Sequence, residues 1–307
     1  MDQATADFLT HLADRNRSPR TLERYGEVLR KFAAFARSEL HREALGVEEI
    51  DKATVAAFVR ETGLRGERLA PATRNNRLAA LRSFFRFLVA EERLGRDPSG
   101  SVAFAHLPER SPTFLTAAEF ARLQAAVEAH GTEHYLRRDL AILVMFWHTG
   151  LRLRELVSLD LDQVNVEAER LRSVHRKGGD RVDVHFNVEV TIALRRWLWQ
   201  RRLYPHHEEE RALFLSDRGT RLSARAIEEL VGKYAAQAKL GKRVSPHTLR
   251  HSTATELVRR GNGIEVVAEV LNHGSLNTTR MYVHLVGEQV HAAVASLAEP
   301  IRASGRK

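Results

Sequence analysis

The stretch ERLRSVHRKGGDRVDVHF, at residues 169–186, is where the side-chain pattern of this chain changes from helical to alternating. Residues 171, 173 and 175 alternate with 170, 172 and 174, and the alternation resumes at Val182 and Val184 after a Lys-Gly-Gly-Asp sequence at 177–180. Two alternating runs joined by a glycine-containing turn are typical of a β-hairpin. We therefore expect a hairpin with Lys177 near its tip, and a small β-sheet in an otherwise helical chain.

Both flanks of this hairpin have helical spacing. Upstream, Thr116 to Glu119 form a capping box that begins one helix. An apolar helix at 137–148 follows, and Gly150 suits the position just after its end. The helices expected after the hairpin cover about 188–202, 224–240, 247–260, 264–271 and 278–299.

The first hundred residues predict four helices. Ser18 and Pro19 begin one of them as an N-cap and a first-turn proline, and Asp51 caps a shorter one. A longer helix starts at Thr73, and its apolar residues follow a 3,4,3 spacing that forms one buried stripe. The three helices with recognisable starts cover about 18–37, 51–59 and 73–92, and the stripe consists of Leu78, Leu81, Phe85 and Leu88.

Four arginines of the 73–92 helix are candidates for DNA contact: Arg74, Arg77, Arg82 and Arg86. Arg82 and Arg86 fall beside the apolar stripe rather than within it. They face either solvent alone or the DNA backbone, and the sequence leaves both alternatives open.

Residues 96–112 have no apolar periodicity and contain Pro98, Pro108 and Pro112, which indicates a linker. A chain of 307 residues is long enough for two ordinary domain cores. We therefore expect an N-terminal domain at 1–98, a linker at 99–112 and a C-terminal domain at 113–307.

The charge of the chain favours a polyanionic partner. The net charge is +9, and the basic residues are 41 arginines and 7 lysines; arginine fits phosphate oxygens with two parallel donors. A genome that prefers arginine codons would explain the same bias, so composition alone leaves nucleic-acid binding open.

The absence of cysteine excludes disulfides and thiolate zinc sites. No apolar run approaches the roughly 20 residues that span a bilayer, and nothing resembles a signal peptide, so we expect a cytoplasmic protein with no membrane partner.

Six residues between positions 152 and 282 supply what phosphodiester cleavage requires without a metal or cofactor. Arg152 and Arg250 can each donate two hydrogen bonds to non-bridging phosphate oxygens. Tyr282 can attack phosphorus, because a base and nearby cations activate a phenol whose pKa is ordinarily about 10. The other three have supporting tasks: Lys177 as general acid, His247 as relay for the phenol proton and His273 as hydrogen-bond donor to the phosphate.

Each of these residues also has a plainer interpretation: a solvated histidine, a packing tyrosine, an exposed turn lysine. Arg152 could simply begin a helix and pair with Glu155. All six residues occur together in this order, spread over the length of one domain. This joint occurrence favours the catalytic interpretation.

These motifs resemble those of the tyrosine site-specific recombinases, the phage integrase family, in a two-domain layout most like the Xer type. The resemblance rests on Thr149-Gly150-Leu151-Arg152 with Glu155, Lys177 in the hairpin, His247-x-x-Arg250-His251, Leu271-Asn272-His273, and Tyr282. It implies a mainly α fold with a small β-sheet. An N-terminal four-helix, SAM-like core-binding domain would precede an α-rich catalytic domain of the DNA breaking-rejoining type.

The resemblance also implies the roles of these residues. Tyr282 would form a 3′-phosphotyrosyl link, the other five would complete the site, and Glu155 would support it. Partners would be double-stranded DNA with inverted-repeat core sites, and a tetramer of this chain alone or with a second recombinase. No ATP, metal or cofactor is implied. Asn272, Arg154 and Thr253 depart from the family's usual glycine, small residue and aromatic residue.

Two other functions compete with a recombinase. A catalytically silent, recombinase-like accessory protein would need only the basic surface, and the presence of all six residues argues against it. A type IB topoisomerase shares the chemistry, but the two-domain layout and the Gly-Leu-Arg and His-x-x-Arg-His motifs point away from it.

Overall fold

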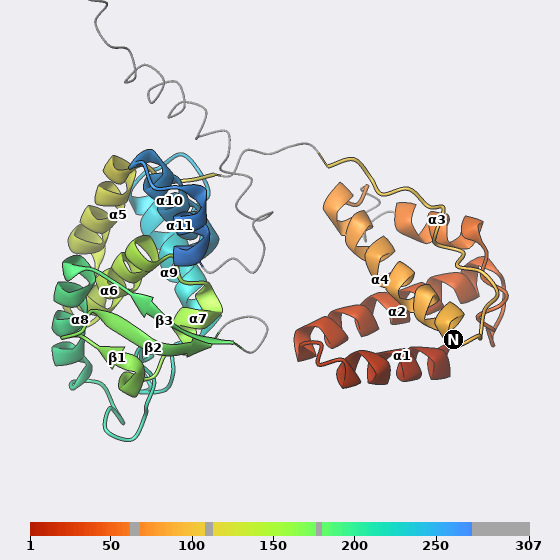
Figure 1. The fold of residues 1–307 in the computed structure, drawn as a ribbon, viewed down its shortest axis with the longest axis horizontal. Helices are drawn as coiled ribbons and strands as arrows, with labels where there is room; N and C mark the ends of the chain where they lie inside the picture. The colour runs from red at the N-terminus through yellow and green to blue at the C-terminus, as the bar shows by residue number, and fades with distance from the viewer. Residues whose placement is uncertain (62–67, 108–112, 176–179, 272–307) are drawn as a thin grey trace, which may run out of the picture. The chain divides into compact units, whose positions relative to one another are not determined.

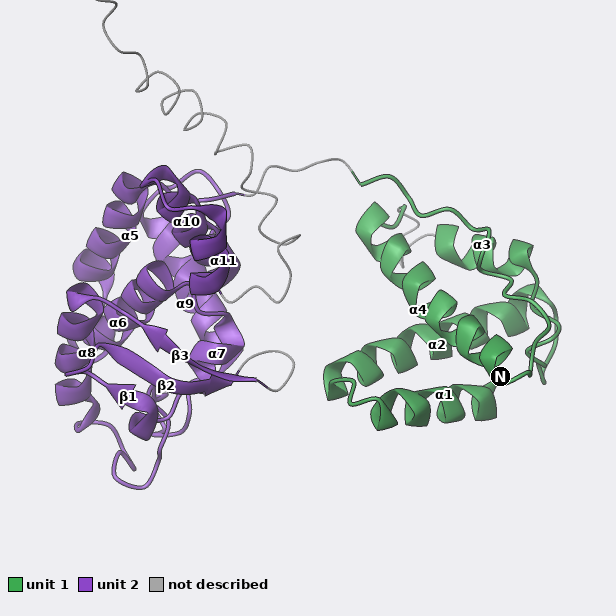
Figure 2. Ribbon diagram, in the orientation of Figure 1, with its two compact units in different colours: residues 1–110 green, residues 111–307 purple. Residues whose placement is uncertain are grey.

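The computed structural model describes residues 1–61, 68–107, 113–175 and 180–271. The chain divides into two compact units, residues 1–110 (unit 1) and 111–307 (unit 2), shown in Figure 2. Unit 1 is helical, and unit 2 combines helices with a small sheet (Figure 1). The predicted fold class is therefore confirmed. Within the described ranges no helix has the length and apolar character needed to cross a bilayer.

The described part of unit 1 contains four helices, as predicted: α1 (Asp2–Asp14), α2 (Pro19–Glu39), α3 (Lys52–Arg60) and α4 (Pro71–Ala90). The side chain of Ser18 accepts a hydrogen bond from the Thr21 amide, and that of Asp51 from the Thr54 amide, so both predicted caps are present. Helix α4 begins at Pro71 rather than at Thr73. A proline suits the first turn of a helix because its missing N–H would have had no partner there.

The core of unit 1 is aromatic. The ring of Phe32 lies 5.2 Å from that of Phe58 and 6.0 Å from that of Phe85. All four residues of the predicted stripe on α4 are buried. Because each fully buried large apolar side chain contributes about 1.5–3 kcal/mol, this stripe holds α4 against the other helices.

The first part of the predicted linker lies against α4. Arg82 donates hydrogen bonds to the backbone carbonyls of residues 99, 100 and 102 at 3.4, 3.1 and 2.6 Å. Asn75 exchanges two hydrogen bonds with the backbone of Ala105, at 2.9 and 2.7 Å. Residues 99–105 are therefore held to unit 1.

Unit 2 combines its helices with a three-stranded sheet of strand order β1-β2-β3, antiparallel throughout. The predicted hairpin is present as β2 and β3, and its turn at 176–179 lies outside the described residues. The described elements are α5 (Ala117–His130), α6 (Glu133–Thr149), α7 (Leu153–Val157), the 3-10 helix η1 (Leu161–Gln163), β1 (Val164–Asn165), β2 (Arg170–His175), β3 (Arg181–His185), α8 (Val188–Arg201), α9 (Ala224–Gln237), α10 (Pro246–Arg259) and α11 (Ile264–Leu271).

Helix α6 is the centre of unit 2, and residues 141–147 within it are all buried. It begins at Glu133, four residues before its predicted start. The capping box of Thr116 and Glu119 at the start of α5 is confirmed. The sequence pattern did not predict β1, because two residues are too few to show a period. Helix α7 begins after Arg152, as the plainer interpretation of that arginine suggested.

Candidate active site

The end of α6 positions Arg152. Gly150, just after this helix, has a φ of +60°, and an added Cβ would lie 2.5 Å from Cδ2 of Leu271. A positive φ and a close neighbour both favour glycine. Leu151 is fully buried, and Arg152 is the N-cap residue of α7. The chain therefore turns from α6 into α7 at a fixed place.

Glu155 holds Arg152 in position. Its side chain is 4% exposed and accepts hydrogen bonds from the Arg152 backbone amide, at 2.8 Å, and from Nη1 of Arg152, at 2.7 Å. The pairing that the sequence offered as the plainer interpretation of Arg152 is thus present. It is compatible with phosphate binding, because the Arg152 side chain remains 34% exposed.

Arg250 joins two motifs that are 100 residues apart. It is 4% exposed, and its Nη1 donates a hydrogen bond to the backbone carbonyl of Gly150. Its Nη2 donates to the carbonyl of Leu271 at 2.5 Å. One buried guanidinium therefore connects α10, the turn between α6 and α7, and the end of α11. A buried charge needs such partners.

His247 shares this environment. It is the second residue of α10, after the N-cap Ser245, whose side chain accepts from the Thr248 amide. Burial lowers the pKa of His247, and the charges of Arg250 and Arg152 lower it further. Three of the six predicted catalytic residues (Arg152, His247 and Arg250) thus lie within electrostatic reach of one another, and the lowered pKa favours the neutral form of His247.

His251 is a neighbour to which the sequence analysis assigned no role. Its Nε2 lies 2.9 Å from Nε2 of His247, and the ring centroids are 4.3 Å apart. Burial, followed by the charges of His247 and Arg250, lowers the pKa of His251 to about 4. The sequence could have indicated this contact between His247 and His251, because residues four apart on a helix share a face.

Two hydroxyls fix helix α10 itself. The Thr253 hydroxyl lies 3.2 and 2.9 Å from the carbonyls of Phe146 and Trp147 at the end of α6. The Ser252 hydroxyl accepts from the Leu115 amide at 2.7 Å. Thr253, one of the departures from the family pattern, therefore anchors α10 to α6 with a polar contact.

The other three predicted catalytic residues, Lys177, His273 and Tyr282, lie outside the described residues. The expected helix at 278–299, and the departure at Asn272, lie outside them too. Their roles stay predictions.

The four arginines proposed for DNA contact have different surroundings in unit 1. Arg77 donates to the Phe58 carbonyl and to Glu61, both at 2.9 Å, and its side chain is 15% exposed. The donors of Arg82 go to the backbone of residues 99–102. Arg74 is half-buried, whereas Arg86 is exposed. Their contact with DNA stays a prediction.

Comparison with known families gives a match over most of the chain. The model described as "Phage integrase family" matches residues 113–288, and "Phage integrase, N-terminal SAM-like domain" matches residues 6–92. Tyrosine recombinase XerC of Pelotomaculum thermopropionicum is 36% identical over 293 residues, which cover 92% of this chain and 94% of the relative. Tyrosine recombinase XerC of Azotobacter vinelandii is 35% identical over 99% of this chain and 98% of the relative.

Solved structures agree with these matches. XerH site-specific recombinase bound to difH substrate, in a pre-cleavage complex, has a TM-score of 0.70 at 25% identity, over 93% of this chain and 81% of that one. The Tn1549 transposon integrase in complex with transposon right end DNA has a TM-score of 0.76, over 97% and 99%. Its identity is 18%, so this likeness concerns the fold alone.

Proposed function

The chain belongs to the phage integrase family, as a Xer-like tyrosine recombinase, and from this premise we propose that it cleaves and rejoins DNA through a 3′-phosphotyrosyl link to Tyr282. Family membership confirms the resemblance found in the sequence. The activity at this level is site-specific DNA recombination, and the covalent mechanism is our proposal.

One observation in the described residues carries this proposal. Arg250 donates to the Gly150 carbonyl, two residues before Arg152, and lies one helical turn from His247. Two guanidinium groups and one neutral imidazole are thereby gathered from motifs distant in sequence. Arg152, whose side chain is 34% exposed, can bind the non-bridging oxygens of a phosphate, and the imidazole can take up one proton. Arg250 donates to the backbone of Gly150 and Leu271 and adds its positive charge to the same site.

In the proposed step the Tyr282 oxygen bonds to phosphorus while the bond from phosphorus to the 5′-oxygen breaks. The phenol proton passes to His247, and Lys177 donates a proton to the leaving 5′-oxygen. His247 suits this role, because its lowered pKa leaves a nitrogen lone pair available at neutral pH. Rejoining reverses the step with a new 5′-hydroxyl, so the energy of the broken bond is conserved.

We propose that the partner is double-stranded DNA with inverted-repeat core sites, bound by a tetramer of this chain alone or with a second recombinase. A second solved structure of XerH, a post-cleavage complex, is bound to a palindromic difH substrate. A palindromic site supports the proposal, because the symmetry of such a site matches that of paired subunits.

The test is covalent capture on DNA. A pool of nicked duplexes with randomised inverted-repeat arms is incubated with the full chain, and adducts that survive denaturation are isolated. The wild type is expected to form adducts and Tyr282→Phe to form none, because the phenol oxygen is the nucleophile. Tyr135→Phe, which loses only a hydroxyl bond to Asp217, is the matched control and should form adducts. Adducts in the Tyr282 variant would reject the nucleophile, and binding without any wild-type adduct would favour the accessory-protein alternative.

A further inference from the structure

Two histidines of α10 bring ring nitrogens together. Nε2 of His251 lies 2.9 Å from Nε2 of His247, and the two rings meet edge to face with an interplanar angle of 75°. This separation of two nitrogens is a hydrogen-bond distance, and it leaves room for a single proton between them. One imidazole therefore donates through its Nε2–H, and the other accepts with the lone pair of its Nε2.

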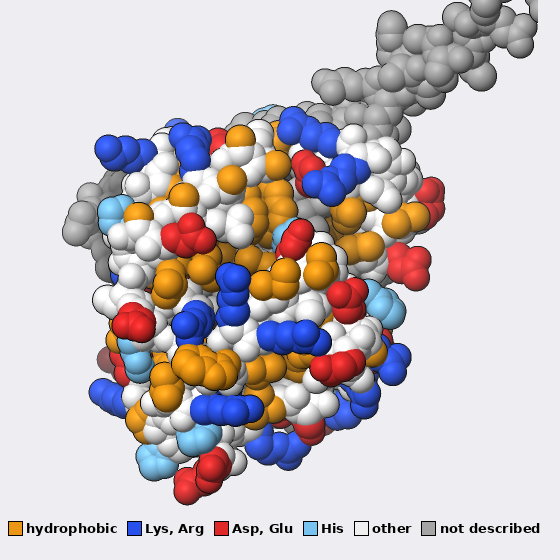
Figure 3. Space-filling view, turned by 90° about the vertical axis from the view of Figure 1, so that its left-hand side faces the viewer, with side chains coloured by type: hydrophobic (Ala, Val, Ile, Leu, Met, Phe, Trp, Pro, Cys, Tyr) orange, Lys and Arg blue, Asp and Glu red, His pale blue; other side chains and the backbone are white. Residues whose placement is uncertain are grey.

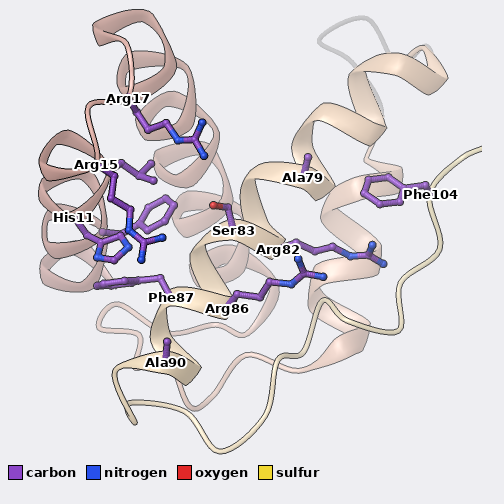
Figure 4. Close-up of a pocket in the computed structure, with 12 residues that line it drawn as sticks. His11, Arg15, Arg17, Ala79, Arg82, Ser83, Arg86, Phe87, Ala90 and Phe104 are labelled. Atoms are coloured by element: carbon purple, nitrogen blue, oxygen red, sulfur yellow. The ribbon is translucent and has the colours of Figure 1, made fainter. Parts of the chain in front are cut away.

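Other histidine rings in the described parts of the chain pack against aromatic carbon. In unit 1 the ring centroid of His11 lies 4.8 Å from that of Phe87 (Figure 4), and in unit 2 that of His134 lies 4.4 Å from that of Tyr204. A carbon ring offers no nitrogen lone pair to an imidazole N–H. The contact between His247 and His251 is of a different kind, because it sets a donor against an acceptor.

The surroundings of His247 oppose a positive charge on its ring. Burial, Arg250 and Arg152 lower its pKa, and its place as the second residue of α10 adds the positive end of the helix dipole. A base in this position needs a partner that stabilises the imidazolium. A carboxylate would do so, but it would also repel a phosphate bound at the same site. A neutral imidazole accepts the hydrogen bond without adding negative charge.

His251 is suited to be that neutral acceptor. It is half-buried, and burial together with the charges of His247 and Arg250 lowers its pKa to about 4. At neutral pH it therefore has one nitrogen lone pair to offer. The positive charges of Arg250 and Arg152 beside His247 attract a lone pair and repel an N–H dipole. They favour the tautomer of His247 that carries its proton on Nε2, toward His251.

We propose that His251 is a positioning residue for the base: it accepts a hydrogen bond from Nε2–H of His247 and leaves the lone pair of His247 Nδ1 for the Tyr282 proton. In the opposite arrangement His247 would accept from His251 and have no lone pair left. Once the phenol proton is on Nδ1, the imidazolium keeps its Nε2–H on His251. Rejoining returns the proton from Nδ1 to the phenol oxygen. This inference rests on the proposed function and deepens it, because it assigns the base to one nitrogen.

The first test compares two variants of His251 in single-turnover cleavage by the full chain. His251→Leu removes the acceptor and should slow cleavage about 10- to 10²-fold, the effect of losing one hydrogen bond to a charged group. His251→Gln places an amide near the former Nε2 and should recover most of the rate. DNA affinity should equal that of the wild type in both. Wild-type cleavage by His251→Leu would overturn the proposal.

A double variant separates positioning from a general effect on α10. If His251 acts only through His247, His251→Leu should cause no further slowing in a chain that already carries His247→Gln. Equal slowing with and without His247 would make His251 a structural residue of the helix and would reject its role toward the base.

His148 at the end of α6 provides the matched control. Its Nδ1 lies 3.0 Å from Nδ2 of Asn187, and burial lowers its pKa as it does that of His251. It lines the groove between α5, α6 and α8, on the side of unit 2 where Figure 3 shows apolar side chains gathered among basic ones. His148→Leu thus loses a comparable hydrogen bond and should cleave at the wild-type rate. Slowing equal to that of His251→Leu would remove the special place of His251.

The tautomer itself is measured by NMR on the full chain without DNA, with histidine isotope-labelled at the ring nitrogens. Their shifts distinguish Nδ1–H from Nε2–H, and His247→Gln identifies the signals of His247. The wild type should show the Nε2–H tautomer, and His251→Leu a mixture. An Nδ1–H tautomer of His247 in the wild type would overturn the proposal. Because this measurement needs neither a substrate nor a stable variant, it decides the role of His251 even if the wild type forms no adducts and the proposed function fails.

Discussion

Replacing Gly150 with alanine is expected to destabilise unit 2 by displacing the contact between α6 and α11. Gly150 has a φ of +60°, and its Cβ would lie 2.5 Å from Cδ2 of Leu271, which is 1% exposed. Leu271 must therefore move within a packed interior. Its backbone carbonyl, like that of Gly150, accepts a hydrogen bond from Arg250.

Two contributions make up the expected loss of unfolding free energy in Gly150→Ala. An alanine at positive φ costs about 1–2 kcal/mol, and forcing a side chain to shift in a packed core costs about 1–3 kcal/mol. Gly241→Ala isolates the first term, because Gly241 has a φ of +66° and no atom within 4 Å of an added Cβ. Gly150→Ala should therefore lose about 1–3 kcal/mol more free energy of unfolding than Gly241→Ala.

Tryptophan fluorescence during urea unfolding measures this difference. All three tryptophans, Trp147, Trp197 and Trp199, lie in unit 2, so the signal follows that unit within the full chain. DNA cleavage by Gly150→Ala should also slow, because a displaced Gly150 carbonyl shifts Arg250 and the start of α7. If Gly150→Ala and Gly241→Ala lost equal stability, the close approach of Leu271 would not be the reason that residue 150 is glycine.

Two other predictions concern the same site. Arg152→Ala and Arg250→Ala should each slow single-turnover cleavage by at least ~10²-fold, the effect of losing one preorganised donor; a rate near wild type would remove that arginine from the phosphate. The lowered pKa of His251 means that the unfolded chain binds more protons between pH 6.5 and about 4, so unit 2 should lose stability as the pH falls through this window. His251→Gln should weaken that loss, and an unchanged curve of stability against pH would contradict the burial of a neutral imidazole.

Local signals predicted much of the fold. The caps at Ser18, Asp51 and Thr116 are confirmed because each makes its hydrogen bond to an amide three residues away. The hairpin is confirmed for a similar reason, since alternation and a turn are visible within one short stretch. Strand β1 was missed because it is shorter than any periodic signal, and α7 was suggested only by Arg152 as a helix start.

The candidate site was only partly predictable. The residue types and order of Arg152, His247 and Arg250 indicated phosphate chemistry, but the sequence did not show that Arg250 is buried against the Gly150 carbonyl. Nor did it show that Arg77 donates to Glu61 within unit 1. These partners lie 16 to 100 residues away along the chain, so no local pattern contains them.

The sequence by itself determined the fold class, the family and the set of charged side chains, because these depend on residue type, spacing and order. Tertiary structure decided which arginines keep their donors available and which direct them to the protein's own backbone. Arg82 and Arg86 lie one helical turn apart on α4, yet only Arg82 meets the carbonyls of residues 99–102. A guanidinium has a fixed number of N–H groups, so the backbone that folds against it determines what remains for DNA.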